Sequence, residues 1–194
     1  MKKLFLILLI AFVQLPVFAQ DIKVSEANGM YHIILAGNKI KKKIEFVQSD
    51  KLITNQCIHQ KYDSKLTINT GFFDLKNQKT ISYIVNDKKI IADPTENFSL
   101  MNSKELQPYM DKILNRSELR ILKCGRKYKY DIARHNDPVC NCCKLIASAQ
   151  GGPQLLPVTD IYQTLEDEFF IVRKNGKVVR QSASVLFRAA RTVV

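Results

Sequence analysis

Three stretches of the sequence begin like β-strands and end in residues that pack poorly but can bind or react with a ligand. Residues 66–74 alternate β-branched and apolar side chains and then break at Gly71. Residues 147–153 run into two glycines before a proline, and residues 188–192 carry two arginines. Taken alone, the first stretch also fits a strand, a turn and two core phenylalanines. The three breaks together are candidates for parts of one site.

The residues at the ends of these three stretches favour binding of a phosphate group. Successive glycines, Gly151 and Gly152, can present backbone N–H groups and let a ligand approach the main chain. The guanidinium of Arg191 offers a forked pair of donors, and Asn69 offers an amide. Arg188 lies three residues before Arg191, so on a strand the two side chains point to opposite faces and only one of them can reach a given pocket.

In this order, the three stretches resemble the motifs of the phosphodiester glycosidase family. The matching sequences are Ile-Asn-Thr-Gly-Phe-Phe-Asp at residues 68–74, Gln-Gly-Gly-Pro-Gln-Leu at residues 150–155 and Ala-Arg-Thr at residues 190–192. The resemblance extends from about Tyr31 to the last residue. It implies an exported hydrolase that cleaves the glycosidic bond of sugar 1-phosphodiesters on glycans, as the lysosomal enzyme of that family does when it exposes mannose 6-phosphate.

Roles for individual residues follow from this reading. Asp74 is the predicted catalytic carboxylate, which activates water or attacks the anomeric carbon, and Asn69 is predicted to orient the sugar or the phosphate. Stabilisation of the departing phosphate is assigned to Arg191 and the glycine amides. The predicted substrate-binding residues are Gly71, Gly151, Gly152 and Arg191. All of these residues except Gly71, which is left open, are predicted to converge on one pocket. The sequence leaves the cofactor open and assigns no metal ion.

Other ionisable residues have weaker support as site residues. Glu166, Asp167 and Glu168 follow the second motif, but a solvated acidic run explains them better. His59 and His135 can serve as acid–base groups, although single histidines are more often structural or exposed.

The C-terminal end is predicted to be incomplete. Residues 185–194 are apolar and β-prone to the last residue, whereas domains usually finish in a polar segment. Members of the family continue into an Asp-Gly-Gly-Gly-Ser-like motif, and this chain stops before it. We therefore expect residues 21–194 to form an incomplete phosphodiester glycosidase-like domain with little activity. The alternative is a non-catalytic glycan- or polyanion-binding protein of the same fold.

The first 20 residues predict a signal peptide. A basic start at Lys2 and Lys3 precedes an apolar run from Leu4 to Val13, and Val17-Phe18-Ala19 places small residues where a signal peptidase cuts. The run is too short for a stable membrane anchor. We expect an exported protein, periplasmic or secreted, whose mature chain begins near Gln20 or Asp21.

The net charge favours an anionic partner. The formal charge is +12, and loss of Lys2 and Lys3 with the signal peptide takes +12 to +10. Most basic residues are scattered, apart from residues 41–43 and the group around Arg126, and no basic face carries interleaved aromatic residues. We expect a phosphorylated glycan or sugar phosphodiester as the partner and no nucleic acid.

Five cysteines give an odd count, so at least one thiol is free or paired outside the chain. Cys140, Cys142 and Cys143 are dense enough to suggest a metal, but no second pair at zinc-finger spacing accompanies them. A local disulfide or reduced surface thiols are favoured over a closed zinc site.

Short strands with one or two helices predict an α+β fold with an antiparallel or mixed sheet. The strands are expected near residues 31–35, 40–47, 66–68, 81–85, 89–92, 119–122, 128–132, 144–149, 169–172 and 177–179. A short helix from residue 50 to about residue 59, capped by Ser49, and weak helix between residues 103 and 114 complete the prediction.

Overall fold

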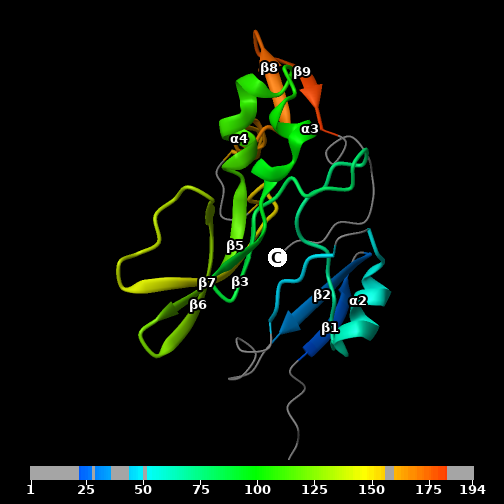
Figure 1. Cartoon of the computed structure of the whole chain (residues 1–194), viewed down its shortest axis with the longest axis vertical. Helices are drawn as coiled ribbons and strands as arrows, with labels where there is room; N and C mark the ends of the chain where they lie inside the picture. Colours follow the sequence, from blue (N-terminus) through cyan, green and yellow to red (C-terminus); the bar gives the residue numbers. More distant parts are fainter. Residues whose placement is uncertain (1–21, 28, 36–43, 50–51, 156–159, 183–194) are drawn as a thin grey trace, which may run out of the picture. The chain divides into compact units, whose positions relative to one another are not determined.

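The computed structural model describes residues 22–27, 29–35, 44–49, 52–155 and 160–182 (Figure 1). The chain divides into two compact units, residues 1–44 and residues 45–194. The predicted signal peptide and the C-terminal residues 183–194, which include Arg188 and Arg191, lie outside the described residues.

The first unit contains one antiparallel hairpin. Strand β1 (Ile22–Ala27) pairs with β2 (Met30–Leu35), and Ile22 lies opposite Leu35. The strand predicted at residues 31–35 is confirmed.

A five-stranded antiparallel sheet forms the centre of the second unit. Its strands follow the order β4-β3-β7-β5-β6. Their bounds are β3 (Ile84–Asn86), β4 (Lys89–Ala92), β5 (Ser117–Cys124), β6 (Lys127–Arg134) and β7 (Cys143–Gln150). Strands β8 (Ile171–Lys174) and β9 (Lys177–Gln181) form a separate antiparallel hairpin. The α+β fold is confirmed, and every strand pair is antiparallel among the described residues.

Short helices lie before, between and after the strands of the sheet in the chain. Their bounds are α2 (Asn55–Tyr62), η2 (Pro94–Glu96), α3 (Phe98–Met101), η3 (Gln107–Tyr109), α4 (Met110–Leu114) and α5 (Ile161–Asp167). No described helix has the length and apolar character needed to cross a membrane. Helices α3 and α4 bury Leu100, Met110 and Ile113 against Phe169, which stacks on Tyr109 at 4.5 Å. This cluster ties the helical layer to the segment that leads into β8.

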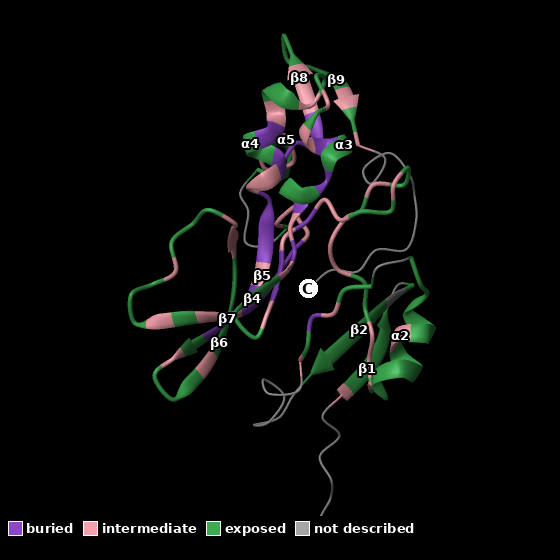
Figure 2. Cartoon of the chain, viewed as in Figure 1, coloured by how far each residue is buried: buried purple, intermediate pink, exposed green. Residues whose placement is uncertain are grey.

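Burial is concentrated in the centre of the sheet. Figure 2 shows buried residues along β5, where Ile121 and Leu122 carry the apolar contribution. Charged side chains of the same strand are also buried: Glu118 and Arg120 expose 3% and 2% of their surface. Charged side chains are rarely buried this deeply unless they are paired, so Glu118 and Arg120 make this part of the sheet a candidate functional site.

Three expectations about local structure are wrong. Residues 66–68 form no strand, because in the described structure the only pairing of residues 66–74 is an isolated bridge between Phe73 and Thr80. The described residues 44–47 form no strand either. Helix α2 begins at Asn55 because Thr54, and not Ser49, caps it: the Thr54 hydroxyl accepts a hydrogen bond from the Cys57 N–H.

Candidate functional site

Polar residues in or next to the five strands meet at one end of the central sheet. The strand register places the start of β3 beside the ends of β4 and β7, and the start of β5 beside the ends of β6 and β7. We call this region the polar sheet end. Its residues are Tyr83, Asp93, Arg116, Glu118, His135, Gln150 and Gly152. An antiparallel sheet therefore collects side chains that are up to 69 positions apart in the sequence.

A buried carboxylate orients a histidine at the polar sheet end. Oε2 of Glu118 lies 3.0 Å from Nδ1 of His135, and Oε1 accepts a 2.7 Å hydrogen bond from Nε of Arg120. An ionised carboxylate can only accept, so Nδ1 of the neutral imidazole carries the proton and Nε2 keeps its lone pair. Nε2 has no hydrogen-bond partner among the described residues, and 27% of the His135 side chain is exposed.

Arg120 fixes the loop that carries His135. Besides Glu118, its guanidinium donates to the backbone carbonyls of Arg134, His135 and Asp137. The loop is held further by Asp137, whose carboxylate accepts from the Arg134 N–H at 2.9 Å. The hydrogen bonds of the buried guanidinium go to this loop and to Glu118, so Arg120 positions His135.

Tyr83 covers one face of the His135 ring. The two rings are parallel within 1° with centroids 4.0 Å apart. Burial raises the pKa of the Tyr83 hydroxyl, and the negative charge of Asp93 raises it further. Tyr83 therefore stays a neutral phenol at neutral pH and keeps a proton that it can donate to a ligand.

The Glu118 carboxylate makes the stability of the fold depend on pH. Burial pushes the pKa of Glu118 upward, but hydrogen bonds from His135 and Arg120, with their charges, outweigh burial and lower the pKa below its ordinary value. The unfolded chain therefore takes up this proton at a higher pH than the folded chain does. The contribution to stability is present above the ordinary carboxyl pKa and is lost as the pH falls through the folded-state pKa.

We expect the stability advantage of the wild type over Glu118→Gln to be largest at neutral pH and to shrink as the solution becomes acid. Glutamine is uncharged at every pH, whereas the Glu118 carboxylate loses its negative charge in acid. Urea unfolding at a series of pH values measures this difference. Glu105→Gln, at an exposed position, is the matched control and should follow the wild-type curve. A wild-type advantage that is independent of pH would contradict the ion-pair account.

Glu168 is a second buried carboxylate at the polar sheet end, and the expectation of a solvated acidic run is wrong for it. The residue is fully buried. Its carboxylate accepts hydrogen bonds from the Ser117 N–H at 2.8 Å, the Ser117 hydroxyl at 2.9 Å and the Gln154 N–H at 3.1 Å. These bonds clamp the glycine segment that follows β7 onto the start of β5. Because its oxygens are already used, Glu168 has a structural role.

Gly152 lies directly against this clamp. Its φ is +70°, and an added Cβ would overlap with Oε2 of Glu168 and lie 3.5 Å from the Phe170 ring. The neighbouring Gly151 N–H donates to the Ser117 carbonyl at 3.0 Å. The Gly151 amide is therefore occupied, contrary to the oxyanion role expected for it, whereas the Gly152 N–H has no acceptor among the described residues.

Arg116 places a guanidinium beside the glycine segment. The charge lies 5.3 Å from the centroid of Phe72 and 4.7 Å from that of Phe170, and Nε donates to the Glu168 carbonyl at 3.0 Å. Burial lowers the pKa of Arg116 to about 10, with Glu168 opposing and Arg180 adding to that shift. The group stays cationic at neutral pH, so the polar sheet end has a fixed positive charge beside two aromatic rings.

Gly71 lies close to the start of the second motif, a contact that the sequence leaves open. An added Cβ at Gly71 would lie 2.9 Å from Ser82 Cβ and 3.4 Å from the Gln150 carbonyl oxygen, and the Ser82 hydroxyl accepts from the Phe72 N–H at 2.7 Å. The glycine is thus required by close approach of the chain. Gly71 and the segment from Gln150 to Gly152 are brought together.

Asn69 and Asp74 are not joined to this group. Asn69 is exposed. Asp74 begins a turn in which its carboxylate accepts from the Lys76 N–H at 2.8 Å and its own N–H donates to the Lys79 carbonyl. Among the described residues, no hydrogen bond or ion pair links either side chain to the polar sheet end. The role of Asp74 stays a prediction, and Arg191 lies outside the described residues.

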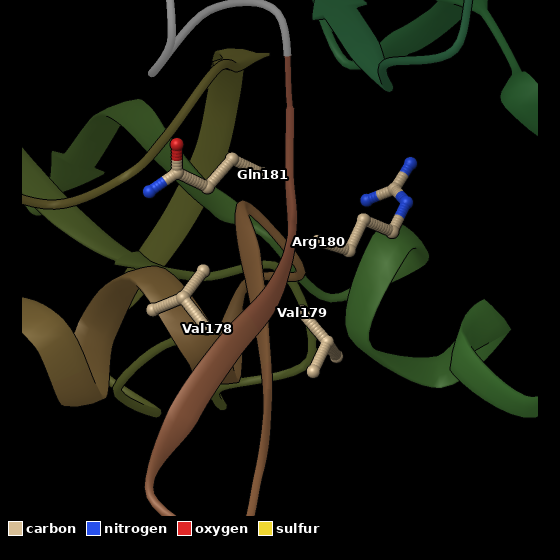
Figure 3. A pocket seen from close by; sticks show the side chains of 4 residues that line it. All are labelled: Val178, Val179, Arg180 and Gln181. Carbon is tan, nitrogen blue, oxygen red and sulfur yellow. The ribbon is translucent and has the colours of Figure 1, made fainter.

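A shallow hollow along β9 lies in the second unit as well. It is lined by Val178, Val179, Arg180 and Gln181, and Figure 3 shows Arg180 on the side of the strand opposite Val178 and Gln181. The Arg180 guanidinium lies 4.1 Å from the centroid of Phe169. The hollow holds no acid–base pair, so it offers less chemistry than the polar sheet end.

Sequence reasoning missed four residues of the polar sheet end, Tyr83, Asp93, Arg116 and Glu118, and it also missed Arg120, which positions His135. A usable signal was present, since Glu118 and Arg120 alternate with Leu119 and Ile121 along one strand. This alternation puts both charges on one face, where an exposed strand would be expected. Comparison with family models, with curated proteins and with solved structures finds no match to this chain.

Proposed function

We propose that this protein is an exported hydrolase that cleaves the glycosidic bond of sugar 1-phosphodiesters. The observation that carries the proposal is the Glu118–His135 pair, in which a buried carboxylate holds Nδ1 at 3.0 Å and leaves Nε2 free among the described residues. The pair lies at the same sheet end as the glycine segment and a cationic Arg116. A directed imidazole beside positive charge suits hydrolysis of an anionic substrate.

The reaction needs one base and a stabilised leaving group. Nε2 of His135 takes a proton from water as the water oxygen bonds to the anomeric carbon, and the bond from that carbon to the phosphate oxygen breaks. The phosphate monoester leaves with the bonding electron pair. Glu118 stabilises the imidazolium that forms. A phosphate ester leaves as an anion, so it requires charge stabilisation and only weak acid assistance.

Three groups of the polar sheet end favour the departing phosphate. Arg116 contributes a fixed charge, the Gly152 N–H is available as a donor, and the Tyr83 phenol keeps its proton at neutral pH. Each of these groups interacts more strongly with the dianionic product than with the monoanionic diester. This set keeps the Gly152 amide that the sequence assigns to this role and adds Arg116 and Tyr83 to it.

Asp74 and His135 are competing candidates for the group that activates water. The carboxylate of Asp74 is partly engaged by the Lys76 N–H in its own turn, whereas His135 has a dedicated orienting partner. The proposal favours His135, with Asp74 retained as the residue that the family resemblance implies.

The test is release of sugar from N-acetylglucosamine 1-(methyl phosphate) by the purified chain. Methyl N-acetylglucosaminide, which lacks the phosphate, is the matched substrate. We expect hydrolysis of the phosphodiester and none of the plain glycoside, because only the former presents an anionic leaving group. Equal hydrolysis of both would contradict the phosphate specificity. Saturable binding of the phosphodiester without turnover would support the non-catalytic binding protein instead.

A further inference from the structure

Four cysteine sulfurs gather at the other end of the β5–β7 pair. Cys124 ends β5 and Cys143 begins β7, and the two residues are register partners joined by a disulfide. A tight turn brings Cys140 back onto this disulfide, since the Cys143 N–H donates to the Cys140 carbonyl at 2.9 Å. Sγ of Cys140 then lies 3.3 Å from Sγ of Cys143, and Sγ of Cys142 lies 3.6 Å from it.

The structure departs from the expected local disulfide, because Cys143 pairs with Cys124 outside the cluster, whereas the expected reduced surface thiols are present at Cys140 and Cys142. The Cys124–Cys143 disulfide spans 19 residues, and it leaves Cys140 and Cys142 as exposed free thiols. Sequence spacing misses this pairing because Cys124 becomes a neighbour only through the sheet register.

We propose that these four cysteines form a thiol–disulfide exchange centre in which the Cys140 thiolate attacks Sγ of Cys143. A Cys140–Cys143 bond forms, the Cys124–Cys143 bond breaks, and the electron pair leaves on Cys124, which takes up the proton equivalent that Cys140 gave up. The disulfide is conserved in this step, so no oxidant or reductant is consumed.

Reactivity is biased toward Cys140. A hydrogen bond with Cys142 is the largest factor that lowers the pKa of Cys140, and the positive charge of Lys129 acts in the same direction. The same hydrogen bond and burial raise the pKa of Cys142. Cys142 is therefore the proton donor and Cys140 the nucleophile, which is the division of roles found in reactive dithiol pairs.

The exchange partner that fits this centre is a low-molecular-weight thiol. Cys140 is exposed, so a dissolved thiolate can reach the Cys140–Cys143 bond. It attacks Sγ of Cys140, forms a mixed disulfide there and releases Cys143 as a thiolate. The released Cys143 thiolate attacks Sγ of Cys140 in the mixed disulfide, which re-forms the Cys140–Cys143 bond and releases the small thiol. The Cys124 thiolate, which the sheet register holds beside Cys143, then attacks Sγ of Cys143, so that the Cys124–Cys143 bond returns and Cys140 leaves as a thiolate.

A metal site is the competing use of the same residues. Sulfur atoms of Cys140, Cys142 and Cys143 lie within 4.8 Å of one another. With Cys143 committed to a disulfide, only two of these sulfurs can be thiolate ligands, and tetrahedral zinc takes four ligands. The disulfide form therefore favours exchange over metal binding.

Disulfide mapping of the full chain in a glutathione redox buffer tests the proposal. Free thiols are blocked with N-ethylmaleimide before digestion and mass spectrometry. We expect two wild-type forms, one with Cys124 bonded to Cys143 and one with Cys124 blocked and Cys140 bonded to Cys143, together with glutathione on Cys140. Cys140→Ser should leave only the first form.

Alkylation rates give an independent measurement. Cys140 should react with iodoacetamide at neutral pH roughly tenfold faster than Cys57, and Cys142→Ala should remove most of that advantage. Cys57→Ser is the matched control and should leave the disulfide forms unchanged. A single disulfide form with Cys140 no more reactive than Cys57 would overturn the proposal. So would one zinc ion per chain that survives dialysis and protects the thiols from alkylation.

Discussion

Gly152→Ala is expected to lower the free energy of unfolding by about 3 kcal/mol or more, because two penalties add at this position. The residue has φ +70°, a conformation that side chains disfavour, and its Cβ would overlap with Oε2 of Glu168. Glu168 cannot move aside without giving up its hydrogen bonds to Ser117 and Gln154. Chemical denaturation monitored by circular dichroism measures the loss.

Gly125→Ala separates the two penalties. Gly125 has φ +58° and no atom within 4 Å of an added Cβ, so only the backbone penalty of about 1 kcal/mol applies there. The clash with Glu168 should account for the rest of the effect at Gly152. Similar losses for both variants would show that the Gly152–Glu168 contact does not constrain the fold.

His135→Gln is expected to lower kcat for sugar 1-phosphodiester hydrolysis by roughly 10²–10⁴-fold with little change in KM. Glutamine retains a polar group beside Glu118 but cannot take a proton from water. Circular dichroism should show an unchanged fold, because the Arg120 contacts that hold the loop go to backbone carbonyls. Steady-state kinetics on purified protein measures the effect.

His59→Gln is the matched control for His135→Gln. His59 is exposed on α2 and lies 3.2 Å from the Ser64 hydroxyl, away from any buried carboxylate contact among the described residues. Its replacement should leave kcat unchanged. Full activity in His135→Gln combined with its loss in Asp74→Asn would reject His135 as the base and support the residue implied by the family resemblance.

Local sequence signals predicted the hairpins of the fold well. Asn175 and Gly176 both adopt positive φ in the turn between β8 and β9, which is why this pair marks a hairpin in the sequence. The sequence also predicts the hairpin of β3 and β4, with a turn around Asn86 and Asp87, and in the structure the residues with positive φ are Asp87 and Lys88, one position later. The strand predicted at residues 66–68 is wrong because alternating β-branched residues form a strand only where a partner strand is present. Strand pairing depends on the tertiary structure and not on the local sequence.

A small part of the candidate site was accessible from the sequence. Gly71 and Gly152 were found because glycine at the end of a strand-like run indicates close approach, which the structure shows at Ser82 and Glu168, whereas Gly151 has no atom within 4 Å of an added Cβ. Glu118 and Glu168 were missed because burial of a carboxylate depends on partners far away in the chain. Arg120, His135 and Ser117 supply those partners through strand register, which no local pattern encodes.

Hydrolysis in ¹⁸O-labelled water is the most direct test of the proposed reaction. Attack on the anomeric carbon places the label in the released sugar and none in the phosphate ester, and mass spectrometry of both products distinguishes the two. We expect wild-type protein acting on N-acetylglucosamine 1-(methyl phosphate) to give labelled sugar, at a rate that falls in His135→Gln. Label in the phosphate ester would show cleavage of the phosphorus–oxygen bond and would contradict a glycosidase.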